Sequence, residues 1–168
     1  IVAGFANLGE LETDGVDFRA NTDFDLGGMG RLQNRLTVSW INSFEITDRS
    51  GTNDFVGLIG STQAQPETRA NLMNIWEMGD WTVVFQSNYI AGQENPPDED
   101  GDFLQVGGYT TNDLQVAWDA PWNATFAVGA TNIGDRYPEL VAVDGRPWNF
   151  DLYDAYGRTT YFRYTQRF

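Results

Sequence analysis

Apolar and polar residues alternate one by one in several stretches of the chain, which are separated by clusters of Gly, Pro, Asn and Asp. In the clearest stretch, Trp81, Val83 and Phe85 fall on one face of an extended strand, whereas Thr82 and Gln86 fall on the other. This two-residue period predicts an all-β, antiparallel chain. About seven strands are expected, at 11–24, 33–47, 69–78, 81–91, 109–119, 123–133 and 157–168.

The connections between these strands differ in length. Tight links occur at 78–80 and 119–123, whereas the links at 48–68, 92–108 and 134–156 are long and polar. Short turns at one end and long loops at the other are typical of outer-membrane β-barrels. The chain has no run of ~18 apolar residues that would predict a spanning helix, but barrel strands give a much weaker hydropathy signal. The pattern therefore favours transmembrane β-barrel strands.

The composition excludes much of the usual catalytic chemistry. The chain has no His or Cys, so it cannot form a Ser-His-Asp triad, a thiol nucleophile or a Cys/His zinc site. It also has no Lys and therefore cannot form a Schiff base. A glycosidase would need two carboxylates at a fixed separation, and nothing in the sequence singles out such a pair. A net charge of -14 argues against nucleic acid as a partner. We therefore expect no enzyme and no organic cofactor.

Tryptophan residues gather beside the tight links. Trp76, Trp81, Trp118 and Trp122 lie next to these links, and Phe168 lies at the same end of the predicted sheet. A barrel places an aromatic girdle at each membrane interface, and these five residues are the predicted girdle. The alternative is a secreted carbohydrate-binding β-sandwich, in which the same rings would anchor the core or stack on sugars.

Two segments near the end of the chain resemble a known family. Residues 132–138 read Asn-Ile-Gly-Asp-Arg-Tyr-Pro, and a long loop separates them from 156–168, where aromatic residues alternate up to Phe168. This pair resembles the C-terminus of TonB-dependent outer-membrane receptors, although Gly134 stands where the family usually has Phe. Three upstream segments are similar to the family's preceding strands, namely 7–17, 109–116 and 120–126. The resemblance therefore runs from about residue 7 to 168.

The resemblance implies that residues 1–168 are the C-terminal segment of a roughly 22-stranded barrel, with no plug domain in this chain. Seven antiparallel strands cannot close a bacterial barrel, so the remaining barrel and the plug are expected in the same or another polypeptide. The implied function is active transport: external loops bind a scarce nutrient, and TonB supplies the energy for import. The implied location is the outer membrane of a Gram-negative bacterium, with lipid, lipopolysaccharide and the barrel-assembly machinery as further partners.

Three sets of residues are candidate sites. The strand pattern predicts nine lumen-facing residues, which could contact the plug or merely satisfy one another: Asp17, Arg19, Asn21, Asp23, Glu45, Asp113, Gln115, Arg163 and Arg167. A loop that combines Arg with aromatic rings could contribute to ligand binding or only fold over the lumen: Arg136, Tyr137, Arg146, Trp148, Asn149, Tyr153 and Tyr156. The acidic loop at 94–102 is either a solvated segment or a calcium site using Asp98, Asp100 and Asp102.

Overall fold

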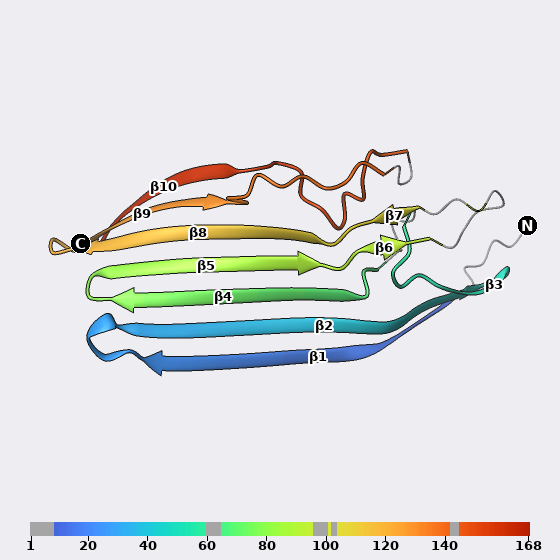
Figure 1. The fold of residues 1–168 in the computed structure, drawn as a ribbon, viewed down its shortest axis with the longest axis horizontal. Coiled ribbons are helices and arrows are strands. Elements are labelled where there is room, and N and C mark those ends of the chain that lie inside the picture. The colour runs from blue at the N-terminus through green and yellow to red at the C-terminus, as the bar shows by residue number, and fades with distance from the viewer. Residues whose placement is uncertain (1–8, 60–64, 96–100, 102–103, 142–144) are drawn as a thin grey trace, which may run out of the picture.

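Seven long strands form one antiparallel sheet in the computed structural model, which describes residues 9–59, 65–95, 101, 104–141 and 145–168. Each strand lies beside the next long strand of the chain (Figure 1). Their bounds are β1 Glu10–Asp25, β2 Arg31–Asp48, β4 Thr68–Met78, β5 Trp81–Ile90, β8 Tyr109–Ala120, β9 Ala124–Thr131 and β10 Thr159–Gln166. The predicted all-β antiparallel fold is confirmed, and every predicted strand end lies within two residues of the observed one.

Three shorter strands and one helical turn complete the described elements. Strand β3 (Gly51–Asp54) pairs with the end of β2, and β6 (Gln93–Glu94) pairs with β7 (Gln105–Val106). The turn η1 (Gly27–Met29) is a 3-10 helix between β1 and β2. Within the described residues, no helix is long and apolar enough to cross a membrane.

The short connections all lie at one end of the sheet, and the long loops lie at the other (Figure 1). The β1–β2 connection needs glycine, because a Cβ atom at Gly30 would come within 1.9 Å of the Glu77 carbonyl oxygen and the φ angle is 87°. The C-terminus also lies at the short-turn end, where the Arg167 backbone N–H donates to the Asn123 carbonyl oxygen at 2.9 Å. Short and long connections therefore alternate along the chain: β1–β2, β4–β5 and β8–β9 are short, whereas β2–β4, β5–β8 and β9–β10 are long.

Residues directly opposite one another in paired strands share a face, so the register defines the two faces of the whole sheet. One row runs across six strands and is entirely apolar: Leu32, Trp76, Val83, Val116, Val128 and Phe162. The face that contains this row, here called the apolar face, carries even-numbered residues at 16–40, 68–78, 110–130 and 160–166 and odd-numbered residues at 81–89. It includes no Asp, Glu or Arg within the strands at these positions.

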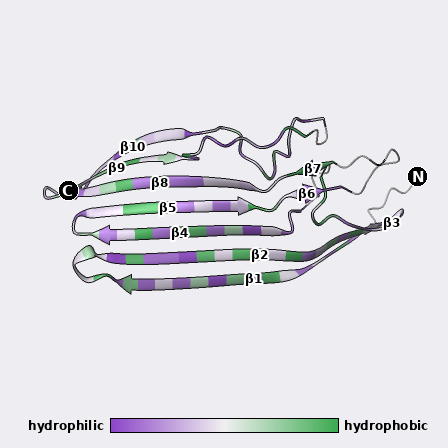
Figure 2. Ribbon diagram, in the orientation of Figure 1, coloured by the Kyte–Doolittle hydropathy of each residue, from purple (hydrophilic) through white to green (hydrophobic). Residues whose placement is uncertain are grey.

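The opposite face, here called the polar face, carries the charge of the sheet. Its charged residues within the same rows are Asp17, Arg19, Asp23, Asp25, Arg31, Arg35, Arg69, Glu77, Asp113, Asp119 and Arg163. Figure 2 shows the resulting alternation of hydrophobic and hydrophilic residues along the strands. Because the two faces differ so sharply, they must meet different surroundings.

Nothing in the described part of the chain covers the apolar face. Phe18 is 54% exposed and Phe162 is 68% exposed, although both lie within strands. The buried apolar cluster of Ile59 and Val106, with Val141 packed against it, lies among the long loops instead. The sheet is therefore a single layer whose large apolar surface requires a cover from outside the described residues.

Candidate functional site

Aromatic rings form a band on the apolar face at the short-turn end. The Trp118 ring is central to this band, because its centroid lies 6.2 Å from that of Trp81, 5.8 Å from Trp122 and 5.9 Å from Phe126. The band continues onto β10, where the Tyr164 centroid is 5.1 Å from that of Phe126. The structure thus brings three of the predicted girdle residues into one cluster.

The two other predicted girdle residues lie at the same end of the sheet. The Trp76 indole Nε1 donates to the Met29 carbonyl oxygen in the β1–β2 connection, at 2.8 Å. Phe168 follows β10 and is fully exposed. At the loop end of the apolar face, Trp40 and Tyr89 provide two further rings that the sequence analysis had not assigned to a girdle.

The spacing of these rings matches a membrane. Trp81 and Tyr89 mark the two ends of the apolar face on β5 and span nine residues, whereas a transmembrane β-strand needs about 9–11 residues. At the loop end the Trp40 indole Nε1 donates to the Glu67 carboxylate at 2.9 Å, which keeps its polar edge among hydrophilic groups. An apolar band between two aromatic rows is typical of the lipid-facing side of a membrane β-barrel.

Most of the predicted lumen-facing residues share the polar face, and several are paired there. Asp17 accepts a hydrogen bond from the Ser39 hydroxyl at 2.6 Å, and Gln115 accepts one from the Tyr161 hydroxyl at 3.0 Å. Asp23 forms a two-pronged ion pair with Arg31, in which Nε donates to Oδ1 at 2.7 Å. The remaining members on this face are Arg19, Asn21, Asp113 and Arg163, and Arg167 lies just beyond the end of β10.

Glu45 differs from the other members of that set. The register shifts between Asp14 and Gly15, because β2 carries Asn42 as an extra residue at this point. Ser43 pairs with Asp14 and Glu45 with Glu12, so alternation along β1 places Glu45 on the face opposite to Asp17. The side chains of Asn42 and Ser43 both donate hydrogen bonds to the Asp14 carboxylate. Two consecutive residues can reach the same side chain because the bulge turns both of them to the same face of the strand.

The Asn132 side chain organises the start of the β9–β10 loop. Its Nδ2 donates to the Arg136 carbonyl oxygen at 2.7 Å, and its Oδ1 accepts from the Arg136 backbone N–H at 3.0 Å. Its own backbone N–H donates to the Asp113 carboxylate at 2.7 Å. Further along, Asp135 accepts from the Arg158 backbone N–H at 2.8 Å and thereby joins the two ends of the loop. The Asn-Ile-Gly-Asp-Arg segment is thus a structural anchor.

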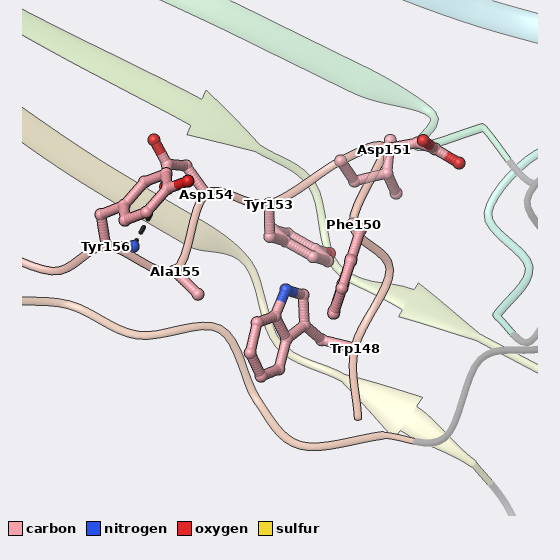
Figure 3. Close-up of a pocket in the computed structure, with 8 residues that line it drawn as sticks. Trp148, Phe150, Asp151, Tyr153, Asp154, Ala155 and Tyr156 are labelled. Carbon is pink, nitrogen blue, oxygen red and sulfur yellow. Dashed lines mark hydrogen bonds between the residues drawn. The ribbon is translucent and has the colours of Figure 1, made fainter. Parts of the chain in front are cut away.

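The same loop surrounds a cavity of about 680 Å³. Figure 3 shows Trp148, Phe150 and Tyr153 close together, with Asp154 and Tyr156 further along the loop. The Trp148 and Phe150 ring centroids are 4.8 Å apart, and the Arg146 guanidinium lies 5.2 Å from the Phe150 centroid. The cavity is lined by Trp148, Phe150, Asp151, Leu152, Tyr153, Asp154, Ala155 and Tyr156.

A second cavity of about 650 Å³ lies between this loop and the sheet. Leu152, Asp154 and Tyr156 line both cavities, so the two adjoin. On the sheet side, the second cavity is lined by seven residues at the loop end of the polar face and by the neighbouring Asn132 and Gly157. The seven are Asn88, Ile90, Tyr109, Thr111, Asp113, Thr131 and Thr159. The loop therefore folds over the polar face and not over the apolar one.

Tyr153 ties this loop to the other long loops. It is 7% exposed, and its hydroxyl donates to the Gln93 Oε1 atom at 3.3 Å. Gln93 in turn donates to the Leu58 carbonyl oxygen at 2.6 Å. Burial raises the pKa of the Tyr153 hydroxyl, and the negative charge of Glu139 raises that pKa further.

The structure assigns the predicted loop residues to different places. The cavity lining includes Trp148, Tyr153 and Tyr156. Arg146 is not part of the lining, but its guanidinium stacks on the ring of the lining residue Phe150. Asn149 is buried beside it, but Arg136 and Tyr137 are exposed and are not among the lining residues. The lining residues Phe150, Asp151 and Asp154 were not predicted, although all three lie within the same aromatic and acidic stretch of sequence.

The predicted calcium residues Asp98, Asp100 and Asp102 lie outside the described residues. Among the residues that are described, no group of three or more acidic side chains could hold a metal ion.

A single-layer antiparallel sheet with an apolar face that is uncharged at the positions given above, a charged opposite face and long loops at one end is typical of the wall of a transmembrane β-barrel. In agreement, residues 2–133 match the family model described as TonB dependent receptor-like, beta-barrel. The chain belongs to this family, whose members are outer-membrane transporters and receptors of Gram-negative bacteria. The family generally acts with a plug domain, TonB and a nutrient ligand. A comparison with curated proteins finds no match.

Proposed function

We propose that the chain forms wall and external loops of an active transporter, which binds a scarce nutrient and imports it with energy transmitted by TonB. The carrying observation is that no charged residue lies on the apolar face at the strand positions that define it; the carboxylates of Glu12 and Glu45 lie on that side only beyond Trp40, towards the loop end. An Arg at a lipid-facing position near the bilayer midplane would cost ~2–4 kcal/mol. The water-exposed face of a soluble sheet carries no such penalty, so charge would not be excluded from it.

The polar face then lines the lumen, and the apolar face meets lipid and, at its loop end, lipopolysaccharide. Residues 1–168 would be the C-terminal barrel segment, so that β1 and β10 join further strands of the barrel. Such joining is needed in lipid, because each of these edge strands has a paired neighbour on only one side in the described sheet. The plug, supplied by the same or another polypeptide, would meet the polar face.

Transport of this kind requires no covalent chemistry from the chain, and we propose that it is not an enzyme. We further propose that the barrel-assembly machinery recognises the exposed aromatic residues on and just after β10, namely Phe162, Tyr164 and Phe168. The competing function, a secreted carbohydrate-binding sandwich, needs a second sheet over the apolar face. In the described residues that face has no such cover, which favours the transporter.

Membrane fractionation tests this proposal. Cells that express the full-length protein are separated into inner and outer membranes, and the outer membranes are washed with carbonate and then urea. We expect the protein to stay in the outer membrane and to migrate differently on a gel before and after heating, as folded barrels do. A protein that washes off as a soluble monomer would contradict the proposed function.

A further inference from the structure

The two adjoining cavities, here together called the groove, extend from the aromatic loop to the polar face. Leu152, Asp154 and Tyr156 belong to both cavities and form the junction. With volumes of about 680 and 650 Å³, each cavity is large enough for a small organic ligand. A ligand in this groove would be long, because it has to pass the junction to use both halves.

The outer half of the groove offers aromatic ring faces. Tyr156 is 88% exposed and Phe150 is 49% exposed, so both rings leave surface open to a ligand. Trp148 and Phe150 pack against each other at an interplanar angle of 37°. Two neighbouring rings in this arrangement present a broad surface and do not enclose a cation from several sides. Broad aromatic surfaces suit ligands with flat apolar patches.

The inner half of the groove offers mainly uncharged hydrogen-bonding groups. Thr111 and Thr159 supply hydroxyl groups that can both donate and accept. Asn88 offers its Nδ2 donor, because its Oδ1 atom already accepts from the side chains of Asn71 and Gln86 at 2.6 and 3.0 Å. The charged side chains among the lining residues of both halves are all carboxylates, namely Asp113, Asp151 and Asp154. Asp113 already accepts from the Asn132 backbone N–H, and Asp154 accepts from the Tyr156 backbone N–H at 3.0 Å.

This lining discriminates against anions. No Arg side chain lines either cavity in the described part of the chain. Arg146 stacks on Phe150, and the positive charges of Arg69 and Arg136 act on the lining residues Tyr153 and Tyr109 from outside the lining. An anionic iron chelate would meet a lining whose charged side chains are all carboxylates, and it would lose hydration there. The net charge of -14 adds a long-range repulsion. Carboxylates remain good acceptors for neutral hydroxyl groups.

We propose that the groove binds an uncharged, polyhydroxylated ligand, an oligosaccharide whose rings stack on Trp148 and Tyr156 and whose hydroxyl groups bond to Asp154, Asn88 and Thr111. This inference rests on the proposed transport function and names the class of nutrient. It assigns the outer half of the groove to capture and the inner half to the passage of the ligand towards the lumen.

Binding measurements on the purified full-length protein in detergent test the inference. The probes are a panel of neutral oligosaccharides (maltohexaose, cellohexaose, xylohexaose and mannohexaose), ferric citrate as an anionic chelate, and choline as an organic cation. Trp fluorescence and calorimetry report binding. We expect one or more oligosaccharides to bind, and Trp148→Ala and Asp154→Asn each to weaken that binding about tenfold, which corresponds to ~1.4 kcal/mol.

Leu140→Ala is the matched control, because Leu140 belongs to the same loop and is 77% exposed but lines neither cavity. It should leave the affinity unchanged. Binding of ferric citrate or choline alone, failure of every oligosaccharide in the panel, or oligosaccharide binding that Trp148→Ala does not weaken would overturn the inference. In those cases retention in the outer membrane would still support the transporter, whereas a soluble protein would refute the transporter whichever probe it binds.

Discussion

At the scale of single residues, Asn132 carries the anchor of the β9–β10 loop. Its side chain is 7% exposed and both donates to and accepts from the backbone of Arg136. Its φ angle of 48° is one that Asn and Asp adopt more readily than most residues do. Asn132→Asp therefore keeps the backbone conformation and the acceptor, but it places a carboxylate oxygen against the Arg136 carbonyl oxygen.

We expect Asn132→Asp to destabilise the loop by about 1–3 kcal/mol, the usual cost of an unsatisfied buried polar group. Limited proteolysis of the folded protein, scored by cleavage within residues 133–158, measures this change. Asn149→Asp is the control, because Asn149 is equally buried but its side chain accepts one bond, from the Asp151 backbone N–H at 2.9 Å. Equal cleavage rates for the two variants would show that Asn132 is not the anchor.

Tyr153 gives the loops a pH dependence. Burial, reinforced by Glu139, raises the pKa of its hydroxyl in the folded loop above the unperturbed value of ~10. The unfolded loop therefore loses this proton at a lower pH than the folded loop does. The contribution of Tyr153 to loop docking is fully present below about pH 10 and is lost as the pH rises through the raised pKa.

Spectrophotometric titration checks this expectation. Subtracting the tyrosinate absorbance of a Tyr153→Phe variant from that of the parent protein isolates the titration of Tyr153. The isolated step should lie above pH 10, and proteolysis of the loops should accelerate over the same pH range in the parent protein alone. A step at or below pH 10 would mean that Tyr153 is not buried against Gln93.

At the scale of secondary-structure elements, the alternation of side chains was enough to predict the seven long strands. It worked because each strand separates an apolar from a polar environment, which imposes a period of two. Even β4 fits, since Met73 and Ile75 lie on the polar face opposite Leu72 and Trp76. The signal fails for β3, β6 and β7, because strands of only two to four residues are too short to show a period of two.

The face on which Glu45 lies could not be predicted from the alternation of residues either. A bulge changes the parity of a strand without leaving a sign in its composition, and the polar residues around Asn42 fit either face. The resulting displacement of Glu45 has little energetic penalty, because this part of β2 extends past Trp40 and pairs with β3 among the loops. Within the apolar band, such a slip would bring charge into lipid.

A pair of neighbouring substitutions on β5 tests the assignment of the two faces. Val83 lies on the apolar face between Trp76 and Val116, whereas Val84 lies on the polar face between Ile75 and Gln115. Val83→Arg should cost up to ~2–4 kcal/mol in the membrane and reduce the amount of assembled barrel. Val84→Arg places the same side chain on the lumen side and should assemble. Heat-modifiable migration of outer-membrane extracts measures assembly, and the reverse order would exchange the two faces.

At the scale of the whole molecule, the candidate site depends on contacts that no local pattern reveals. The loop that contains Tyr153 meets Gln93, 60 residues earlier in the chain, and Gln93 meets Leu58 in yet another loop. Sequence analysis predicted an aromatic ligand loop from its composition. It could not predict that Asp154 would face the polar side of the sheet beside Asn88 and Thr111, because that arrangement depends on how the loop folds back.

Because the short turns and the long loops lie at opposite ends of the sheet, we expect them on opposite sides of the outer membrane. The chain has no Cys, so single cysteines introduced at either end can test this expectation. Arg49 lies in the exposed β2–β3 hairpin at the loop end, and Asp80 lies in the exposed β4–β5 turn at the other end. Each is changed to Cys in a full-length protein without other thiols, and intact cells are treated with a membrane-impermeant maleimide.

Arg49→Cys should react on intact cells, because the long loops of a barrel face the exterior. Asp80→Cys should react only after the outer membrane is permeabilised, since the short turns face the periplasm. Reaction of Asp80→Cys alone on intact cells would reverse the orientation and place the aromatic groove in the periplasm, where it could not capture an external nutrient. Equal reaction of both variants on intact cells would mean that the sheet does not separate two compartments, and the apolar face would then need a protein cover in place of lipid.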